Sequence, residues 1–169
     1  MAPAIKMIIG AAALAALAAC TNTADTANST GAGTEGTVTP VTQVDESSAA
    51  YFTASVGDKV FFDTNSSTLD AAAQTTLTFQ ADWLLRFPDR TIVIEGHADE
   101  RGTREYNLAL GARRAQAAYD FLLAQGVPAG RMSTVTFGKE RPVSLCSDES
   151  CWSQNRRSIS VLAGGAPLG

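Results

Sequence analysis

The junction between a buried strand and a long helix constrains this fold more than any other feature of the sequence. Ile92, Val93 and Ile94 form an unbroken apolar run, which is typical of a central strand, and a polar loop follows them. The loop contains Asp99, and the helix predicted after it contains Arg114, fifteen positions further along. A carboxylate on the loop that faces a guanidinium on the helix suits a zwitterionic ligand better than a catalytic step.

Hydrophobic periodicity and turn residues divide the rest of the folded region into strands and helices. Ser67 or Thr68 is expected to cap the first helix, with Asp70 in its first turn, and Pro88 and Gly126 mark helix ends. The order β-α-β-α-β-β predicts an α+β sandwich, with two helices on one face of a small mixed sheet. The expected strands are 58–62, 91–97, 132–137 and 157–162, the expected helices are 69–87 and 103–125, and a polar loop is expected at 139–152.

The N-terminus has the pattern of an export signal. Lys6 precedes an apolar run over 7–19 that is too short to span a bilayer as a helix. The run ends in Leu17-Ala18-Ala19-Cys20, which resembles a bacterial lipobox. We therefore predict a lipoprotein signal peptide over 1–19, with Cys20 as the acylated first residue of the mature chain. An ordinary signal peptide that happens to contain Cys20 is the alternative.

The next segment, 20–56, is rich in threonine, alanine, serine and glycine. Residues 21–50 contain neither an aromatic nor a basic side chain. Such a composition cannot bury enough apolar surface to offset the entropy of ordering, so we predict a disordered tether. The folded domain is then expected over 57–169.

Charge and cysteine content narrow the classes of partner. The formal net charge is −4 over 169 residues, without the basic stripe that nucleic-acid binding requires. Cys146 and Cys151 lie close together near the C-terminus, and in an exported protein paired thiols persist as a disulfide. A metal pair is the alternative, but no second pair of ligands accompanies these cysteines, and the single histidine, His97, is distant in sequence.

Helical spacing selects one side of the second helix as a candidate binding surface. Asn107, Gly111 and Arg114 fall on one stripe, whereas the adjacent Arg113 points about 100° away. Glycine in a helix interior costs roughly 0.5–1 kcal/mol relative to alanine, so the space at Gly111 is expected to serve a purpose. It could form the floor of a pocket, or it could permit close packing against the sheet.

The run Glu95-Gly-His-Ala-Asp-Glu-Arg-Gly-Thr-Arg-Glu-Tyr-Asn107, with Leu110-Gly-Ala-Arg-Arg-Ala115, closely resembles the OmpA-like family of peptidoglycan-associated lipoproteins. The resemblance extends from about 60 to 162. It implies that Asp99 takes the ammonium of meso-diaminopimelate in peptidoglycan and that Arg114 takes its carboxylate, with Asp63 in the same pocket. Substituting Asp99 or Arg114 by alanine is then expected to abolish sacculus binding while the fold survives.

The resemblance also implies a place in the cell. Thr21, rather than an aspartate, follows Cys20, and this resembles lipoproteins that reside in the outer membrane. The protein would then be an outer-membrane lipoprotein held in lipid by the acylated Cys20, with its domain facing the periplasm. It would tether the membrane to the cell wall as part of the Tol system, chiefly through the periplasmic propeller protein of that system (TolB). Neither a cofactor nor a metal is expected.

Several alternatives stay open at this point. Asp99 could be a loop-capping residue, and Arg114 could form a surface ion pair. The Arg156-Arg157 pair resembles the closing motif of the family, but a solvated strand edge is the interpretation that we favour. An enzyme would use Glu95, His97, Asp99 and Glu100 as an acid–base or metal cluster, although a core position for His97 is more consistent with the sequence. An envelope protein-interaction module without direct cell-wall binding is the other alternative.

Overall fold

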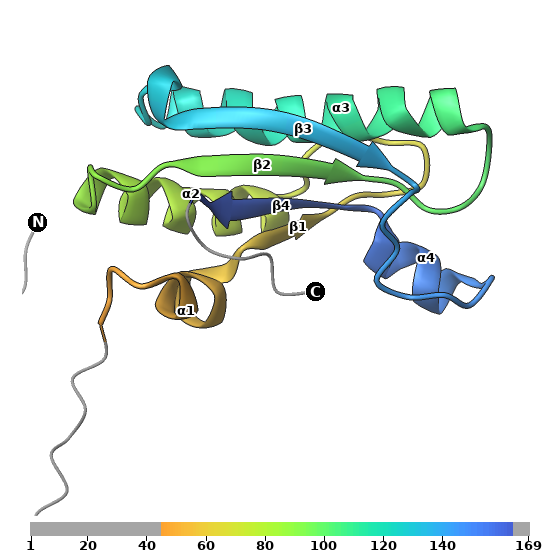
Figure 1. Cartoon of the computed structure of the whole chain (residues 1–169), viewed down its shortest axis with the longest axis horizontal. Coiled ribbons are helices and arrows are strands. Elements are labelled where there is room, and N and C mark those ends of the chain that lie inside the picture. The colour runs from red at the N-terminus through yellow and green to blue at the C-terminus, as the bar shows by residue number, and fades with distance from the viewer. Residues whose placement is uncertain (1–44, 164–169) are drawn as a thin grey trace, which may run out of the picture. The chain divides into compact units, whose positions relative to one another are not determined.

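The computed structural model describes residues 45–163, which form a four-stranded mixed sheet with helices against it (Figure 1). The strand order is β1-β4-β2-β3. β2 pairs in parallel with β3 and antiparallel with β4, and β4 pairs antiparallel with β1. The strands are β1 (Lys59–Phe61), β2 (Ile92–His97), β3 (Met132–Gly138) and β4 (Arg157–Leu162), and the helical elements are α1 (Ala49–Tyr51), η1 (Phe52–Gly57), α2 (Ala71–Arg86), α3 (Arg104–Ala124), η2 (Ala129–Arg131) and α4 (Glu149–Asn155).

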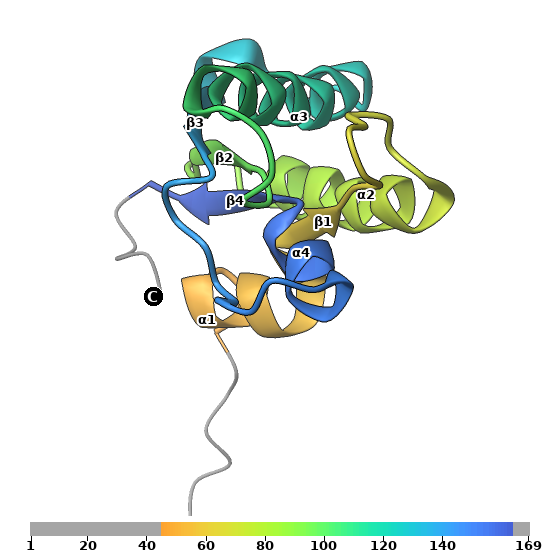
Figure 2. The same cartoon turned by 90° about the vertical axis from the view of Figure 1, so that its right-hand side faces the viewer.

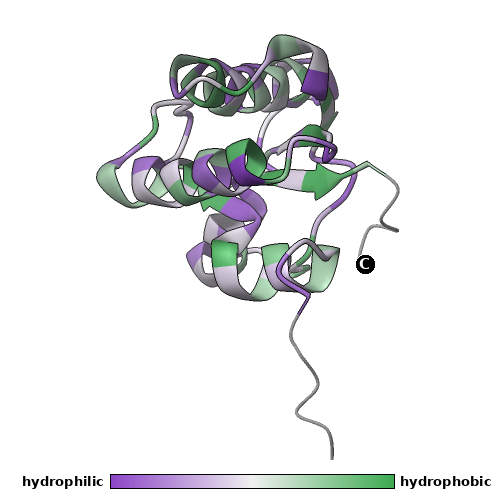
Figure 3. Cartoon of the chain, turned by 90° about the vertical axis from the view of Figure 1, so that its left-hand side faces the viewer, coloured by the Kyte–Doolittle hydropathy of each residue, from purple (hydrophilic) through white to green (hydrophobic). Residues whose placement is uncertain are grey.

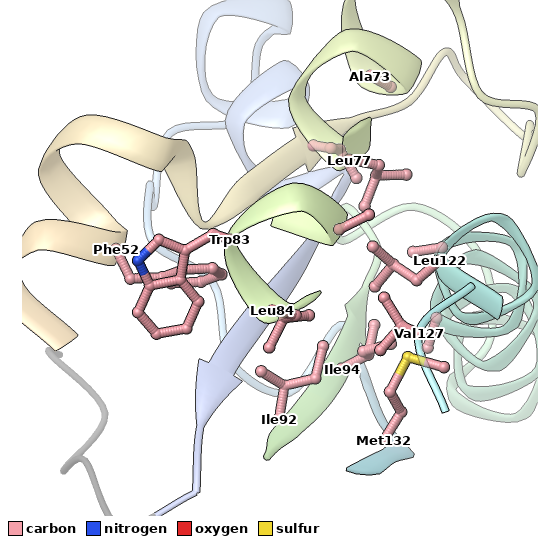
Figure 4. Close-up of a cluster of buried hydrophobic side chains, with 14 of the residues drawn as sticks. Phe52, Ala73, Leu77, Trp83, Leu84, Ile92, Ile94, Leu122, Val127 and Met132 are labelled. Atoms are coloured by element: carbon pink, nitrogen blue, oxygen red, sulfur yellow. The ribbon is translucent and has the colours of Figure 1, made fainter. Parts of the chain in front are cut away.

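The two long helices cover one face of the sheet, as predicted (Figure 2). Their banded hydropathy is typical of helices that bury one side (Figure 3). The core side chains converge from α2, α3 and the strands (Figure 4). The fully buried members include Leu77 and Leu84 of α2, Ile94 of β2 and Leu122 of α3. The predicted α+β class is therefore confirmed.

The first helix begins later than predicted. Asp70 has an extended backbone and its side chain accepts a hydrogen bond from the backbone N–H of Ala73 at 2.7 Å. Asp70 is therefore the N-cap of α2 and not a residue of its first turn, and Ser67 and Thr68 lie upstream in the loop. A carboxylate is as good a cap as a hydroxyl and also favours the positive end of the helix dipole.

The ordered fold also begins earlier than Gly57. Phe52, on η1, is 1% exposed and its ring lies 4.8 Å from that of Trp83 on α2. The Trp83 indole N–H donates to the carbonyl of Glu46 at 2.8 Å. The tether prediction was therefore wrong for the segment from 45 to 56, because the packing of Phe52 on Trp83 and the hydrogen bond from Trp83 to Glu46 anchor this segment to α2. Residues 1–44, with the predicted signal peptide and Cys20, lie outside the described residues.

The loop predicted over 139–152 contains the start of a further helix, α4. Asp148 caps it by accepting from the N–H of Ser150 at 2.8 Å. Cys146 and Cys151 form a disulfide across the start of this helix, with their Cα atoms 5.6 Å apart. The predicted disulfide is thus present, and it fixes a helix that is too short to give a periodic signal in the sequence.

The approach of α3 to the sheet depends on two glycines. A Cβ atom added at Gly96 on β2 would lie 1.8 Å from the carbonyl oxygen of Gly111, and one added at Gly111 would lie 2.5 Å from the hydroxyl of Thr136. The helix backbone therefore rests directly on β2. Within 45–163, no helix combines the length and the apolar character that crossing a membrane would need.

Candidate ligand-binding site

The candidate site lies at the edge of the sheet where β1 and β2 end. These strands are parallel to each other, with β4 inserted antiparallel between them. Their outgoing loops therefore leave on the same edge, where β4 begins and where α4 is located (Figure 1). This topology brings together the loop after Phe62, the loop that carries Asp99, and Arg156 just before β4.

Asp99 is 7% exposed and accepts hydrogen bonds mainly from its neighbour Arg101. The Arg101 side chain donates from Nη2 to Oδ2 at 2.6 Å and from Nε to Oδ1 at 3.2 Å, and its backbone N–H donates to Oδ1 at 3.1 Å. Burial opposes ionisation of the Asp99 carboxyl, but these bonds outweigh it and hold its pKa below the ordinary value. Asp99 is therefore a carboxylate at neutral pH.

Arg114 is fully buried, with 0% of its surface exposed. Its guanidinium donates from Nε to the carbonyl of Ser66 at 2.8 Å, from Nη1 to that of His97 at 2.8 Å, and from Nη2 to that of Asp63 at 3.0 Å. Burial lowers the pKa of Arg114 to about 10, so it stays charged at neutral pH. Arg114 thus joins the loop after β1 to the end of β2, and the alternative of a surface ion pair is wrong.

Asp63 lies at the mouth of the site. Its side chain is exposed, and its carbonyl accepts hydrogen bonds from Arg114 and from the backbone N–H of Ser66. It borders a shallow depression of ≈ 380 Å³. The other residues that line this depression are Phe61, Phe62, Asp70, Ser153, Gln154 and Arg156. Asp63 is therefore available to a ligand at the same edge as Asp99.

Two other predicted site residues have structural roles. Asn107 is 1% exposed and its amide donates to the carbonyls of Arg101 and Thr103, at 2.8 and 3.1 Å, so it supports the loop before α3. Gly111 permits the close contact with Gly96 and does not form a pocket floor. That either residue also contacts a ligand stays a prediction, because helical spacing identifies a shared stripe but not what covers it.

Arg156 is a site residue that the sequence interpretation assigned to a solvated strand edge. It is 5% exposed, and its Nε donates to the carbonyl of Phe62 at 2.9 Å. Its Nη2 is bound to Glu149 of α4. Its Nη1 is buried without a hydrogen-bond partner and lies 3.5 Å from Oδ2 of Asp99. Arg156 Nη1 therefore forms an ion pair with Asp99 and still has an unused hydrogen-bonding capacity that suits a carboxylate.

Arg157 was also expected at a solvated edge and is 3% exposed. Its Nη2 donates to the carbonyl of Arg141 at 3.2 Å, which steadies the loop after β3. Asn155 fixes the same loop, because its amide oxygen accepts from the N–H groups of Val143 and Ser144 at 2.8 and 3.2 Å. The Asn155-Arg156-Arg157 motif is therefore buried throughout. Neither the pattern of apolar and polar residues in this strand nor the charge of the two arginines indicated such burial.

His97 is a core residue rather than a metal ligand in this arrangement. It is 1% exposed, its ring stacks on Phe137 at 5.5 Å, and its Nε2 lies 3.3 Å from Glu95. Burial, assisted by Arg157 and Arg141, lowers its pKa to about 3, so it is neutral at pH 7. Among the described residues, Cys146, Asp148 and Cys151 are the one group with metal-ligand spacing, and the disulfide engages both of their sulfurs.

The site combines charges of both signs. The carboxylates of Asp63, Asp99, Glu100 and Glu149 lie around the guanidinium groups of Arg101, Arg114 and Arg156. A guanidinium can bind a carboxylate, and Asp99 can bind an ammonium. The arrangement is compatible with a zwitterionic group, and the guanidinium that lies beside the Asp99 carboxylate and has a nitrogen without a hydrogen bond is that of Arg156.

Comparison with known proteins gives a consistent result. A model of the OmpA family matches residues 61–156. The chain is 65% identical over 113 residues to a protein of Agrobacterium fabrum named peptidoglycan-associated lipoprotein, which covers 67% of this chain and 64% of that protein. A protein of the same name from Mesorhizobium japonicum is 62% identical over 117 residues, or 69% of this chain and 70% of the relative.

A solved structure supports the same relationship. The crystal structure of the peptidoglycan-associated lipoprotein from Burkholderia pseudomallei superimposes with a TM-score of 0.63 and 43% sequence identity. The superposition covers 65% of this chain and 95% of that one. The range that the OmpA family model matches includes Asp99, Arg114 and Arg156.

Proposed function

The chain belongs to the OmpA family, and from this membership and the geometry of the site we propose that it binds diaminopimelate-type peptidoglycan without a covalent bond. Its relatives have a name that describes association with peptidoglycan and not a reaction. The protein is accordingly a binding protein and not an enzyme. The observation that carries the proposal is the buried carboxylate of Asp99 beside the donor of Arg156 that has no hydrogen-bond partner, at 3.5 Å.

The far end of a diaminopimelate side chain carries an ammonium and a carboxylate on one carbon. We assign the ammonium to Asp99, with Asp63 as a second acidic group at the mouth of the site. We assign the carboxylate to Arg156 Nη1 and to the N–H donors of Arg114 that its three carbonyl bonds leave free. A peptide that ends in lysine brings the ammonium alone and leaves these donors unpaired, which is costly in a buried site.

The wider role follows from the sequence of the N-terminus and from the relatives. The apolar run that ends at Cys20 and the name lipoprotein shared by the relatives support an acylated Cys20 held in the outer membrane. The domain would then tether the outer membrane to the cell wall from the periplasmic side, and the Tol proteins would be its protein partners. An envelope protein-interaction module without cell-wall binding is the alternative function.

Sedimentation of the protein with purified sacculi tests the proposal. Sacculi that contain diaminopimelate should carry the protein into the pellet, and sacculi that contain lysine in its place should leave it in solution. Asp99→Asn should lose the binding while its thermal unfolding stays near that of the wild type. Asp120→Asn is the matched control, because Asp120 is an exposed carboxylate on α3 bound only to Gln116. Equal sedimentation of all three proteins would contradict the assignment.

A further inference from the structure

Arg101 occupies the position on Asp99 that the proposed function reserves for the ligand. Its guanidinium binds both oxygens of the carboxylate, from Nη2 to Oδ2 at 2.6 Å and from Nε to Oδ1 at 3.2 Å. The Asp99 side chain is 10% exposed and that of Arg101 is 39% exposed. Arg101 therefore lies on the solvent side of the carboxylate and closes it from the direction in which a ligand arrives.

The closed position has its own support. The Arg101 guanidinium lies over the ring of Trp152 on α4, with Cζ 4.1 Å from the ring centroid. The Trp152 indole N–H donates to Glu100 at 3.1 Å, which ties α4 to the loop that carries Arg101. The Cys146–Cys151 disulfide and Asn155 hold α4 in place. The aromatic surface under Arg101 is therefore part of a fixed frame, while Arg101 itself is a loop side chain.

Leaving the closed position would cost Arg101 little besides the ion pair. Apart from Asp99, its side chain has one long hydrogen bond, from Nη2 to the hydroxyl of Thr64 at 3.4 Å. The Trp152 ring, 4.1 Å from Cζ, and the charges of Glu100 and Glu149 attract the guanidinium independently of Asp99. Arg114, in contrast, holds three carbonyls and cannot leave without disrupting the loop after β1.

We propose that Arg101 is an internal competitor of the ligand, a guanidinium that occupies the ammonium site on Asp99 and must be displaced before the site can bind. This inference rests on the proposed function. A ligand that carries only an ammonium replaces the Arg101–Asp99 ion pair with its own ion pair to Asp99, so it gains little binding free energy. A ligand that also carries a carboxylate adds bonds to Arg156 and Arg114. Competition by Arg101 therefore means that a ligand needs both an ammonium and a carboxylate to bind well.

Calorimetric titration of the full-length protein in detergent tests whether Arg101 competes with the ligand for Asp99. The probes are soluble muramyl tripeptides that end in meso-diaminopimelate or in lysine. Arg101→Gln should bind both probes about tenfold more tightly than the wild type, the factor expected when a closed form outnumbers an open one by roughly ten to one. The gain should be equal for the two probes, because each displaces the same ion pair. Arg101→Lys keeps a cation on Asp99, so its affinities for the two probes should lie between those of the wild type and those of Arg101→Gln.

Arg86→Gln is the matched control. Arg86 also combines an ion pair, to Glu46 at 2.6 Å, with an aromatic ring, that of Phe87 at 5.3 Å, but it lies on α2 away from the site. It should leave both affinities unchanged although the net charge falls by the same amount. Unchanged or weaker binding of diaminopimelate by Arg101→Gln, with the wild type binding normally, would overturn the competitor alone. Absence of binding by the wild type and by Arg101→Gln would overturn the proposed function as well.

Discussion

The Asp99 carboxylate is bound by Arg101, with Nη2 2.6 Å from Oδ2, while Arg114 is bound to three backbone carbonyls. Spacing in the sequence had paired Asp99 with Arg114. In the structure the two residues lie in the same site but have different roles. Asp99 presents a charge to the ligand. Arg114 uses three of its N–H groups to hold together the two loops between which the ligand would enter, and only the remaining N–H groups can bind the ligand carboxylate.

Arg114→Ala should therefore unfold far more easily than the wild type, and the expectation that this variant keeps its fold is revised. Removing the guanidinium takes the side-chain donor from the buried carbonyl of His97 and the partly buried carbonyl of Ser66, while the carbonyl of Asp63 keeps the backbone N–H of Ser66. Each unsatisfied group costs roughly 1–3 kcal/mol. Urea denaturation should show a loss of unfolding free energy of about 3–5 kcal/mol. Arg113→Ala, at the exposed neighbouring position, should lose little. Equal stability of the two variants would contradict the clamp role of Arg114.

Gly111→Ala should also destabilise the protein, although alanine favours a helix by roughly 0.5–1 kcal/mol. The new Cβ would lie 2.5 Å from Thr136 Oγ1 and 2.8 Å from the carbonyl oxygen of Gly96. Moving α3 away from β2 should cost about 1–3 kcal/mol net, measurable as a lower Tm. Gly130→Ala is the control, because a Cβ atom there meets nothing within 4 Å. A Gly111→Ala protein as stable as this control would show that the contact can relax.

Stability should fall between pH 7 and pH 5.5 because of His97. Burial lowers the folded-state pKa of His97 to about 3 from its ordinary value of 6.5, so the unfolded chain binds a proton that the folded chain does not bind. The resulting stabilisation is present above pH 6.5 and is lost as the pH falls toward 3, with about 1 kcal/mol lost by pH 5.5. The raised pKa of Glu95, which burial causes, acts in the opposite direction nearer its own titration range. In urea titrations His97→Gln should show a flat profile over this interval, and a decline as steep as that of the wild type would assign the effect to another group.

Reducing the Cys146–Cys151 disulfide should lower the free energy of unfolding by about 2 kcal/mol, the entropy expected for a loop of this size. The double variant Cys146→Ser/Cys151→Ser should match the reduced wild type and should not respond to reductant. Thermal unfolding with and without reductant measures both. A wild type that reductant leaves unchanged would mean that Asn155 alone fixes the loop.

The sequence was sufficient to predict the sheet and both long helices because their signals are strong and local. Ile92–Ile94 is uniformly apolar, and the helical pattern that ends before Gly126 agrees with the observed end of α3 at Ala124. The segment around Phe52 was missed because its order depends on Trp83, a residue far along the chain. Helix α4 was missed because seven residues are too few for periodicity to emerge.

The site was predictable in its residue types and not in its contacts. Family motifs located Asp99 and Arg114 correctly at one edge of the sheet. Pairing, however, is decided by side-chain geometry, and an arginine two residues from Asp99 reaches its carboxylate more easily than one on the next helix. The charge of Arg156 suggested solvent, yet β4 runs through the middle of the sheet and buries its flanking residues. The signal that could have identified it is its place directly before a central strand.

Titration of the ¹⁵N-labelled protein with a muramyl tripeptide that ends in meso-diaminopimelate tests the central claim most directly, because it reports where the ligand binds. We predict that the largest chemical-shift changes fall on the backbone N–H groups of Asp99 and Arg101 and on the side-chain Nε–H of Arg101 and Arg156, and that the lysine tripeptide causes far smaller changes. Changes that spare this edge of the sheet, or that are the same for the two tripeptides, would contradict it.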